Sequence, residues 1–433
     1  MRLLLGLLVL FAPAGLQAQL SKQEAEAVAV VDREAGRHVA LLERLVNQNS
    51  GTLNLPGVRA VADLLRPEFE ALGMEVQWID MSATGRAGHF VARHRDRTRG
   101  PSKHILLIGH LDTVFEPGSP FQRFERSGER ATGPGIGDDK GGIVVIVSAL
   151  RALREAGLLQ RMDVTVVLTG DEERPGSPIE AARRDLVAAG READYALEYE
   201  NLAREGERDF GTVARRSSAS WTLTTRGRTG HSSGIFSSNQ GYGAIYEMAR
   251  ILDAFRRDLP EPNLTYNVGV IGGGTPAQID AQGLNVTASG KTNIIAQTAV
   301  ARGDLRVLTP DQQTRIRARM QEIVARHLPH TSAELVFAEG GYPPMAPTAG
   351  NRALLAALNA VNRALGLPEM AEYDPARRGA ADSAFVAGDV DVLAGMGMAG
   401  GGAHAEGEWV GLASLPLQAK RSAILINRLS RGR

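Results

Sequence analysis

The chain has 433 residues, 43% of them hydrophobic and 23% charged, a length and composition that favour two or three folded domains and exclude an intrinsically disordered chain. Its 49 basic and 49 acidic side chains balance, which excludes the basic surface of a nucleic-acid-binding protein, so no nucleic-acid partner is expected. Because cysteine is absent, disulfides and thiolate chemistry are excluded, and any bound metal must be held by His, Asp and Glu.

The amino terminus has the pattern of an export signal. Arg2 precedes the apolar run 3–11, and the small residue Ala18 follows. A bilayer span needs about 20 apolar residues, roughly twice this run. We therefore predict a cleaved signal peptide over residues 1–18 and a periplasmic or secreted protein with no membrane attachment after cleavage. An uncleaved anchor is the alternative.

Helices and strands alternate after this segment. Strands alternating with helices are typical of an α/β sheet with a substantial parallel part. Helical patterns cover 23–49, 57–72 and 142–156, and strand-like runs cover 75–79, 90–94, 104–108 and 164–169.

The pattern changes near residue 213. Residues 213–342 combine two helical patterns, 241–256 and 310–328, with strands at 221–225, 264–271, 283–288, 298–308 and 333–338. Helix–strand alternation then resumes. We predict a larger mixed-sheet α/β domain formed by 19–212 and 343–433, interrupted by a smaller α+β domain at 213–342.

Titratable side chains follow the predicted strands. His110 and Asp112 stand two residues apart, a spacing that points both to one face of an extended chain. Glu172 and Glu173 also follow a buried strand, at the sheet end where open α/β proteins place their sites. A hydrogen-bonded histidine and a solvated acidic loop are the structural alternatives.

Three further segments carry candidate ligands. Asp138 lies in a glycine-rich stretch that opens a helix, and the two adjacent aspartates there would repel a phosphate but suit a cation. Glu200 ends another short strand. His404 follows the glycine-rich run 395–402, whose backbone could approach a site closely.

In chain order these motifs resemble the signature of the di-zinc aminoacylase and carboxypeptidase family of metallopeptidases. The likeness extends over essentially the whole mature chain. It implies that Asp112 orients a ligand and that Glu172 is the general base. It also implies five ligands for two zinc ions per subunit: His110 and Glu200 at one, Glu173 and His404 at the other, and Asp138 bridging them.

Charge supports this interpretation independently. Two Zn²⁺ ions carry four positive charges, which three carboxylates and a bridging hydroxide cancel, so the cluster suits a low-dielectric cleft. A pair of zinc ions about 3.5–4 Å apart can polarise a carbonyl and activate water. The mixed nitrogen and oxygen ligands also suit Co²⁺ or Mn²⁺.

Residues 213–342 resemble the family's lid and dimerisation domain, which implies a homodimer formed through them. His231 occupies the place of a histidine lent across the dimer to polarise the scissile carbonyl. Asn293 and Arg306 match a substrate-binding pattern, and a guanidinium fork suits a carboxylate. The alternatives are a surface histidine at 231 and a structural ion pair between Arg306 and a lid acid.

One departure from the family pattern bears on specificity. Residues 378–382 read Arg-Gly-Ala-Ala-Asp where the family has Gly-Gly-Thr-Asp. This removes a hydroxyl from the substrate region but no metal ligand.

We therefore expect an exported zinc exopeptidase of the carboxypeptidase type, related to glutamate carboxypeptidase, that releases a C-terminal amino acid from a small peptide. An N-acyl-amino-acid deacylase is the alternative, and a panel of peptides and N-acyl amino acids separates the two. A catalytically silent dimeric binding protein is a third hypothesis. It predicts damage at the ligands or the base, and the sequence shows none.

Overall fold

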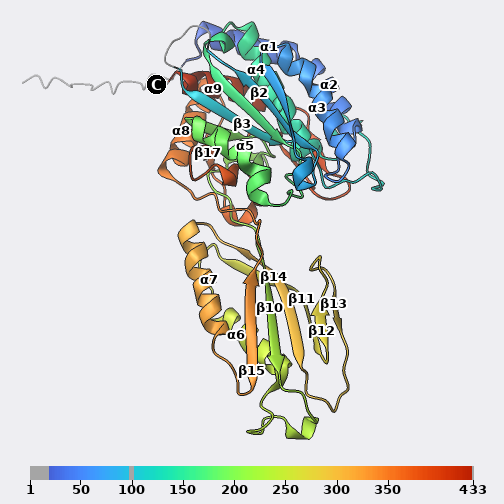
Figure 1. Cartoon of the computed structure of the whole chain (residues 1–433). Coiled ribbons are helices and arrows are strands. Elements are labelled where there is room, and N and C mark those ends of the chain that lie inside the picture. The colour runs from blue at the N-terminus through green and yellow to red at the C-terminus, as the bar shows by residue number, and fades with distance from the viewer. Residues whose placement is uncertain (1–18, 97–101, 432–433) are drawn as a thin grey trace, which may run out of the picture.

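The computed structural model describes residues 19–96 and 102–431, so the signal peptide predicted at 1–18 lies outside the described residues. Two sheets with their own helices form two lobes joined by a narrow connection (Figure 1). Among residues 19–96 and 102–431, none of the helices combines the length and apolar character needed to cross a bilayer.

The larger sheet is mixed. Strands β6, β3, β7 and β17 run parallel to one another, while β1 and β2 form an antiparallel pair at one edge, with β2 also antiparallel to β6. The predicted α/β class with a mixed sheet is confirmed. In sheet order the strands are β1 (Glu75–Asp80), β2 (Gly88–His94), β6 (Asp163–Thr169), β3 (His104–His110), β7 (Tyr195–Glu198) and β17 (Asp391–Leu393).

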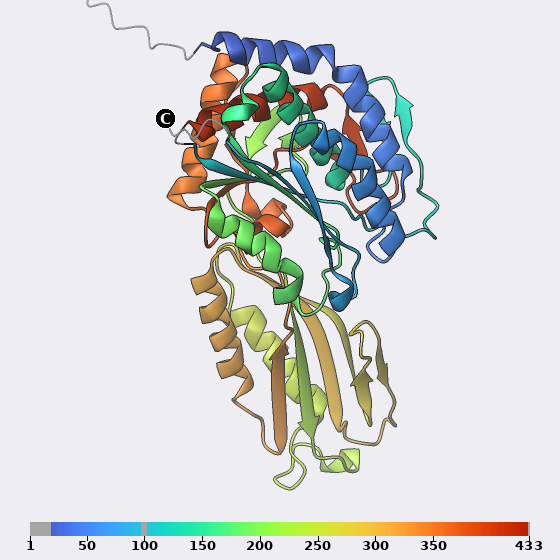
Figure 2. The ribbon, with the colours of Figure 1, turned by 45° about the horizontal axis from the view of Figure 1, so that its top comes forward.

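Helices cover both faces of this sheet. Successive side chains of a strand point to opposite faces, and in β3 Leu107 joins one buried cluster while Leu106 and Ile108 join another. Helix α5 (Ile179–Glu192) packs in the second cluster. The first cluster holds α1 (Lys22–Arg33), α2 (Ala35–Asn47), α3 (Leu55–Glu70), α4 (Gly141–Glu155), α8 (Ala349–Ala364) and α9 (Ser414–Ser430), of which α1, α2 and α3 line the outside in Figure 2.

The predicted helix at 23–49 is two helices. The chain bends at Glu34, which ends α1 and precedes α2. Its carboxylate accepts a hydrogen bond of 2.8 Å from Arg151 of α4. Helix α1 packs on α4 and α9, while α2 packs on α4 and on the turn Ile136–Lys140 that opens α4.

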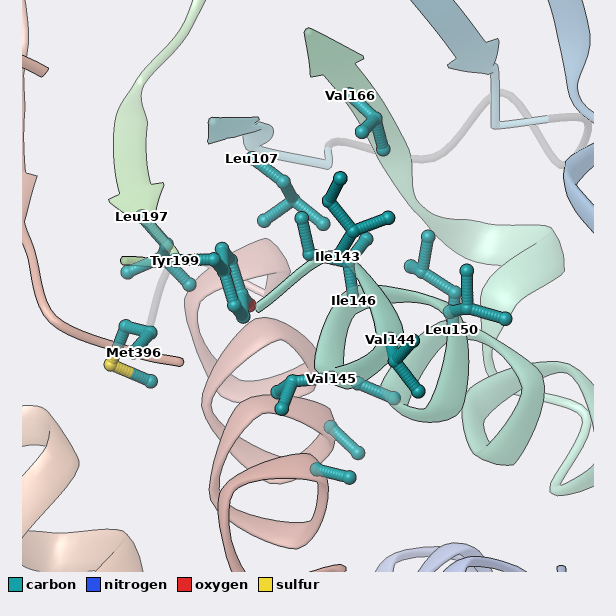
Figure 3. Close-up of a cluster of buried hydrophobic side chains, with 14 of the residues drawn as sticks. Leu107, Ile143, Val144, Val145, Ile146, Leu150, Val166, Leu197, Tyr199 and Met396 are labelled. Carbon is teal, nitrogen blue, oxygen red and sulfur yellow. The ribbon is translucent and has the colours of Figure 1, made fainter. Parts of the chain in front are cut away.

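Helix α4 is the centre of the core. Its residues from Gly141 to Leu150 are all buried, because strands lie on one side and α9 on the other. Figure 3 shows its aliphatic side chains meeting Leu107, Val166 and Leu197 of the sheet. Burying each such side chain stabilises the fold by about 1.5–3 kcal/mol. Because α4 is held firmly by this packing, the segment that opens it is held in place as well.

The smaller sheet is fully antiparallel, in the order β11 (Thr265–Gly274), β14 (Thr298–Arg306), β10 (Ala219–Gly227) and β15 (Thr331–Phe337). Helices α6 (Gly243–Asp258) and α7 (Pro310–Val324) pack on it around Trp221, forming a core of its own. The hairpin of β12 (Ala277–Ile279) and β13 (Val286–Ala288) lies beside β11.

Two adjacent chain segments connect the lobes. We call 212–218 and 338–345 the connecting segments. They pair with each other through the bridges Arg215–Met345 and Ser218–Tyr342. Side chains from both segments contact residues that follow strands of the larger sheet: Arg215 contacts Glu200, and Tyr342 contacts Glu172.

Candidate metal centre

The candidate residues converge at one edge of the larger sheet. His110 ends β3, Glu172 and Glu173 follow β6, and Glu200 follows β7. Because these neighbouring strands are parallel, their carboxyl ends lie side by side. Asp138 comes from the turn Ile136–Lys140 that opens α4.

Asp138 stands between two histidines. Its Oδ1 lies 3.0 Å from Nε2 of His110, and its Oδ2 lies 3.2 Å from Nε2 of His404. His404 also lies 3.0 Å from Oε2 of Glu173. The two oxygens of Asp138 thus face two different imidazoles, an arrangement that suits a carboxylate shared by two ions.

Ligand atoms form two close groups that share His110. One contains Asp138 and Glu173, the other Glu172 and Glu200, and within each group the atoms lie within 4.8 Å of one another. The five ligands implied by the resemblance are brought together, with Glu172 beside them. Imidazole and carboxylate donors without sulfur fit Zn²⁺, Co²⁺ or Mn²⁺.

The electrostatics of the site call for added positive charge. Burial raises the pKa values of Glu172 and Glu173, and raises the pKa of Glu200 to about 8. Hydrogen bonds to Asp138 and Glu173 raise the pKa of His404 to about 11. Without a metal, protonated groups balance these acids, so divalent cations could replace the protons.

Asp112 organises the acidic loop as well as His110. Its carboxylate accepts backbone N–H bonds from Glu172 at 2.9 Å and Glu173 at 3.2 Å, and a hydroxyl bond of 2.6 Å from Thr52. Nδ1 of His110 lies 3.1 Å from the Asp112 carbonyl and 3.5 Å from its carboxylate. One buried aspartate therefore positions both halves of the site.

Glu408 is an organising residue that sequence reasoning missed. Its buried carboxylate accepts backbone N–H bonds from Gly135, Gly137 and Asp138 at 2.8–3.0 Å. A glycine-rich turn with several free N–H groups needs an anion. The acid four residues after His404 was the available signal.

Arg215 was also missed. Its Nη2 donates to Glu200 at 2.7 Å and to Glu198 at 3.0 Å, so this connecting-segment residue holds a candidate ligand. The basic pair Arg215 and Arg216, where the sequence pattern changes, was the signal.

A second buried network reaches the candidate base from the other connecting segment. The Tyr342 hydroxyl donates a 2.5 Å hydrogen bond to the carbonyl of Glu172 and accepts one of 3.1 Å from Arg183. Arg183 in turn pairs with Asp171 at 2.6 Å and Asp382 at 2.7 Å. The backbone of Glu172 is thus held by Asp112 on one side and Tyr342 on the other.

Three predicted residues lie in the smaller lobe, apart from this cluster. Nδ1 of His231 lies 2.8 Å from Oγ of Ser233. The backbone carbonyl of Asn293 accepts a hydrogen bond from the backbone N–H of Ser232, the residue after His231. Nε of Arg306 donates to Oδ2 of Asp304 at 2.9 Å. This is the structural ion pair with a lid acid that was the alternative to substrate binding. Within the described part of one chain, no contact joins these three residues to the ligand groups.

Known proteins resemble the chain over most of its length. Carboxypeptidase G2 of Pseudomonas sp. strain RS-16 is 27% identical over 402 residues, which cover 91% of this chain and 90% of that protein. Succinyl-diaminopimelate desuccinylase of Gluconobacter oxydans is 27% identical over 241 residues, 53% of this chain and 58% of that protein.

Solved structures share the fold. Aminopeptidase PepT of Bacillus cereus superposes with a TM-score of 0.72 at 20% identity, over 91% of this chain and 98% of that one. A dinuclear metal-binding M20 peptidase of Bacillus subtilis superposes with a TM-score of 0.63 at 14% identity, over 92% of this chain and 99% of that one.

Residues 106–428 match the peptidase family M20/M25/M40. The chain belongs to this family, and it is a metallohydrolase whose candidate ligand residues meet at the carboxyl ends of three parallel strands.

Proposed function

We propose that this protein is an exported, zinc-dependent exopeptidase of the carboxypeptidase type that releases a C-terminal amino acid from a small peptide. The observation that carries the proposal is the pair of ligand-distance groups that share His110, one of which also contains Glu172. Carboxypeptidase G2, similar over nine tenths of both chains, supports the carboxypeptidase assignment.

The chain's own side chains have distinct roles in this proposal. His110, Asp138, Glu173, Glu200 and His404 hold two ions, which when bound supply Lewis acidity to the scissile carbonyl and the attacking water. Glu172 accepts the proton of that water and delivers it to the leaving amine. Its backbone is fixed on both sides, so the carboxylate is oriented before substrate arrives.

The smaller lobe supplies the remaining parts. We infer a homodimer through residues 213–342, in which His231 of one copy polarises the carbonyl held in the other. Asn293 and Arg306 bind the substrate, with the guanidinium on its free carboxylate. The exposed position of His231 supports a role toward a second chain. Sedimentation of the purified protein tests the dimer.

Replacing the base tests the mechanism. In Glu172→Gln we expect the bound metal to stay while turnover falls by about two or more orders of magnitude, the usual effect of losing a general base. Metal analysis and steady-state kinetics measure both quantities. Glu180→Gln, an exposed glutamate on α5, is the matched control. Normal turnover in Glu172→Gln would show that another group is the base.

Zinc and export need their own tests. Metal analysis of the protein purified from its native host identifies the ion, and cobalt or manganese in place of zinc would correct the proposal. Fractionation of that host, with the amino-terminal residue of the exported form determined, tests cleavage after residue 18.

Deacylation is the second candidate, because succinyl-diaminopimelate desuccinylases recur among the relatives at 26–33% identity. A panel of dipeptides and N-acyl amino acids separates the two activities. Hydrolysis confined to substrates with a free amino terminus would contradict both.

A further inference from the structure

Arg378 lies on a loop that is fixed on both sides. Nη2 of Arg216 donates to the carbonyl of Ala376 at 3.0 Å, and Nη1 of Arg215 donates to the carbonyl of Gly379 at 3.1 Å. Both donors come from the first connecting segment. The guanidinium of Arg378 is therefore attached to a backbone with little freedom.

This guanidinium is mostly buried, and its ion pair with Glu200 is long. Its side chain is 13% exposed, and among the described residues its Nε and Nη2 atoms have no hydrogen-bond partner. The nearest carboxylate is that of Glu200, whose Oε2 lies 3.8 Å from Nη2, beyond hydrogen-bond distance. Arg215 already donates to the same oxygen at 2.7 Å.

An arrangement of this kind is costly without a ligand. Arg215 and Arg378 lie beside the same oxygen of Glu200, so two guanidinium groups share one carboxylate. Buried guanidinium groups are normally paired and hydrogen-bonded.

We propose that Arg378 is a specificity-determining residue that binds a carboxylate of the substrate beside the metal centre. This inference rests on the proposed function, in which Arg306 binds a first carboxylate and Arg378 a second. The second carboxylate belongs either to the side chain of the released residue or to the acyl part of the substrate.

The geometry favours a carboxylate over a neutral group. Arginine presents parallel N–H donors in a planar fork, which match the two oxygens of a carboxylate. Two of these nitrogens are unused, and the backbone bonds on either side keep the fork in place. A neutral amide would add no negative charge to the carboxylate of Glu200, which Arg378 shares with Arg215.

Matched substrate pairs test the proposal. One pair differs only at the released residue, glutamate against glutamine; the other differs only in the acyl group, succinyl against butyryl. In Arg378→Gln we expect KM for the acidic member of one pair to rise about 10- to 100-fold, the effect of losing a charged hydrogen bond, with kcat nearly unchanged. The neutral members should be unaffected, and Arg378→Lys should restore part of the preference. The pair that responds identifies the source of the carboxylate.

Arg377→Gln is the matched control, because this neighbouring arginine pairs with Glu205 and packs over the ring of Tyr373. Its kinetics should equal those of the wild type. Metal content is measured in every variant. Calorimetric binding of glutamate against glutamine, and of succinate against butyrate, to the metal-loaded protein gives a readout that needs no turnover.

Two results would overturn the proposal. Loss of metal, or an equal fall in kcat for acidic and neutral substrates, would make Arg378 a positioning residue for Glu200. Equal binding of acidic and neutral ligands by wild type and Arg378→Gln would show that it binds no carboxylate. If no substrate is turned over by the wild type, the proposed function fails, while calorimetry still decides the role of Arg378.

Discussion

His38 is a buried titratable side chain outside the metal-ligand groups. Its Nδ1 lies 3.1 Å from Oγ of Ser148 in α4, and burial lowers its pKa to about 4. In the unfolded chain a histidine titrates near pH 6.5. Its stabilising contribution is therefore complete above about pH 6.5 and decreases as the pH falls toward 4, because the unfolded state binds the proton first.

This shift predicts a pH-dependent stability. Between about pH 7 and pH 5 the metal-free protein should lose about 2 kcal/mol of its free energy of unfolding through His38. Urea unfolding with excess chelator at both pH values measures the loss. His38→Leu should show a smaller pH dependence, and an unchanged one would mean that other groups carry the effect.

At the scale of residues, the sequence predicted the candidate metal ligands better than the residues that hold those ligands in position. The same strand ends and turns carry other acids, such as Asp139, Asp171 and Glu198. The resemblance in motif order and spacing to the family signature singles out His110, Asp138, Glu173, Glu200 and His404. Glu408 does not, because its contact with Asp138 spans 270 residues of chain. Which N–H groups an acid will meet depends on the packed backbone, which spacing does not describe.

Among the elements, the connecting segments have the most direct access to the chemistry. Tyr342 on the second segment donates to the carbonyl of Glu172. In Tyr342→Phe we expect kcat to fall about fivefold, the value of one neutral hydrogen bond, with metal content unchanged. Steady-state kinetics and metal analysis measure these quantities.

The control for this prediction is Tyr373→Phe, since Tyr373 packs on Phe210 outside the centre. A wild-type kcat in Tyr342→Phe would show that Asp112 alone suffices to position Glu172. Loss of metal would place the contribution of Tyr342 in ligand geometry instead.

Strong periodicity predicted the long elements well. The alternation of Trp221-Thr-Leu-Thr-Thr corresponds to β10, whose side chains alternate between buried and partly exposed. Short or bent elements were less accessible: the pattern at 283–288 yields only β13, and β12 was not predicted. Hairpins of three residues a strand have too few side chains to show a period.

For the whole molecule, the centre links metal binding to stability. Ligands that bind only the folded state stabilise it by mass action. Removing metal with a chelator should lower the melting temperature by about 5–15 °C, and restoring zinc should recover it. Differential scanning calorimetry measures the change. A melting temperature insensitive to chelator would contradict a tightly held metal at these residues.

The arrangement of the two lobes could not be predicted from the sequence. The change of pattern near residue 213 indicates an inserted domain, and the smaller sheet does lie within 219–337. How the lobes sit relative to each other depends on a few connecting contacts, such as Ser218 with Tyr342. For the same reason His231 could not be placed relative to the centre.

The contact between Glu408 and the glycine-rich turn has a consequence for biosynthesis. The turn is translated about 270 residues before Glu408, whose carboxylate accepts hydrogen bonds from its N–H groups. A polypeptide that stops before residue 408 lacks the acceptor for these three N–H groups, so we expect the turn that carries Asp138 to be unordered in it.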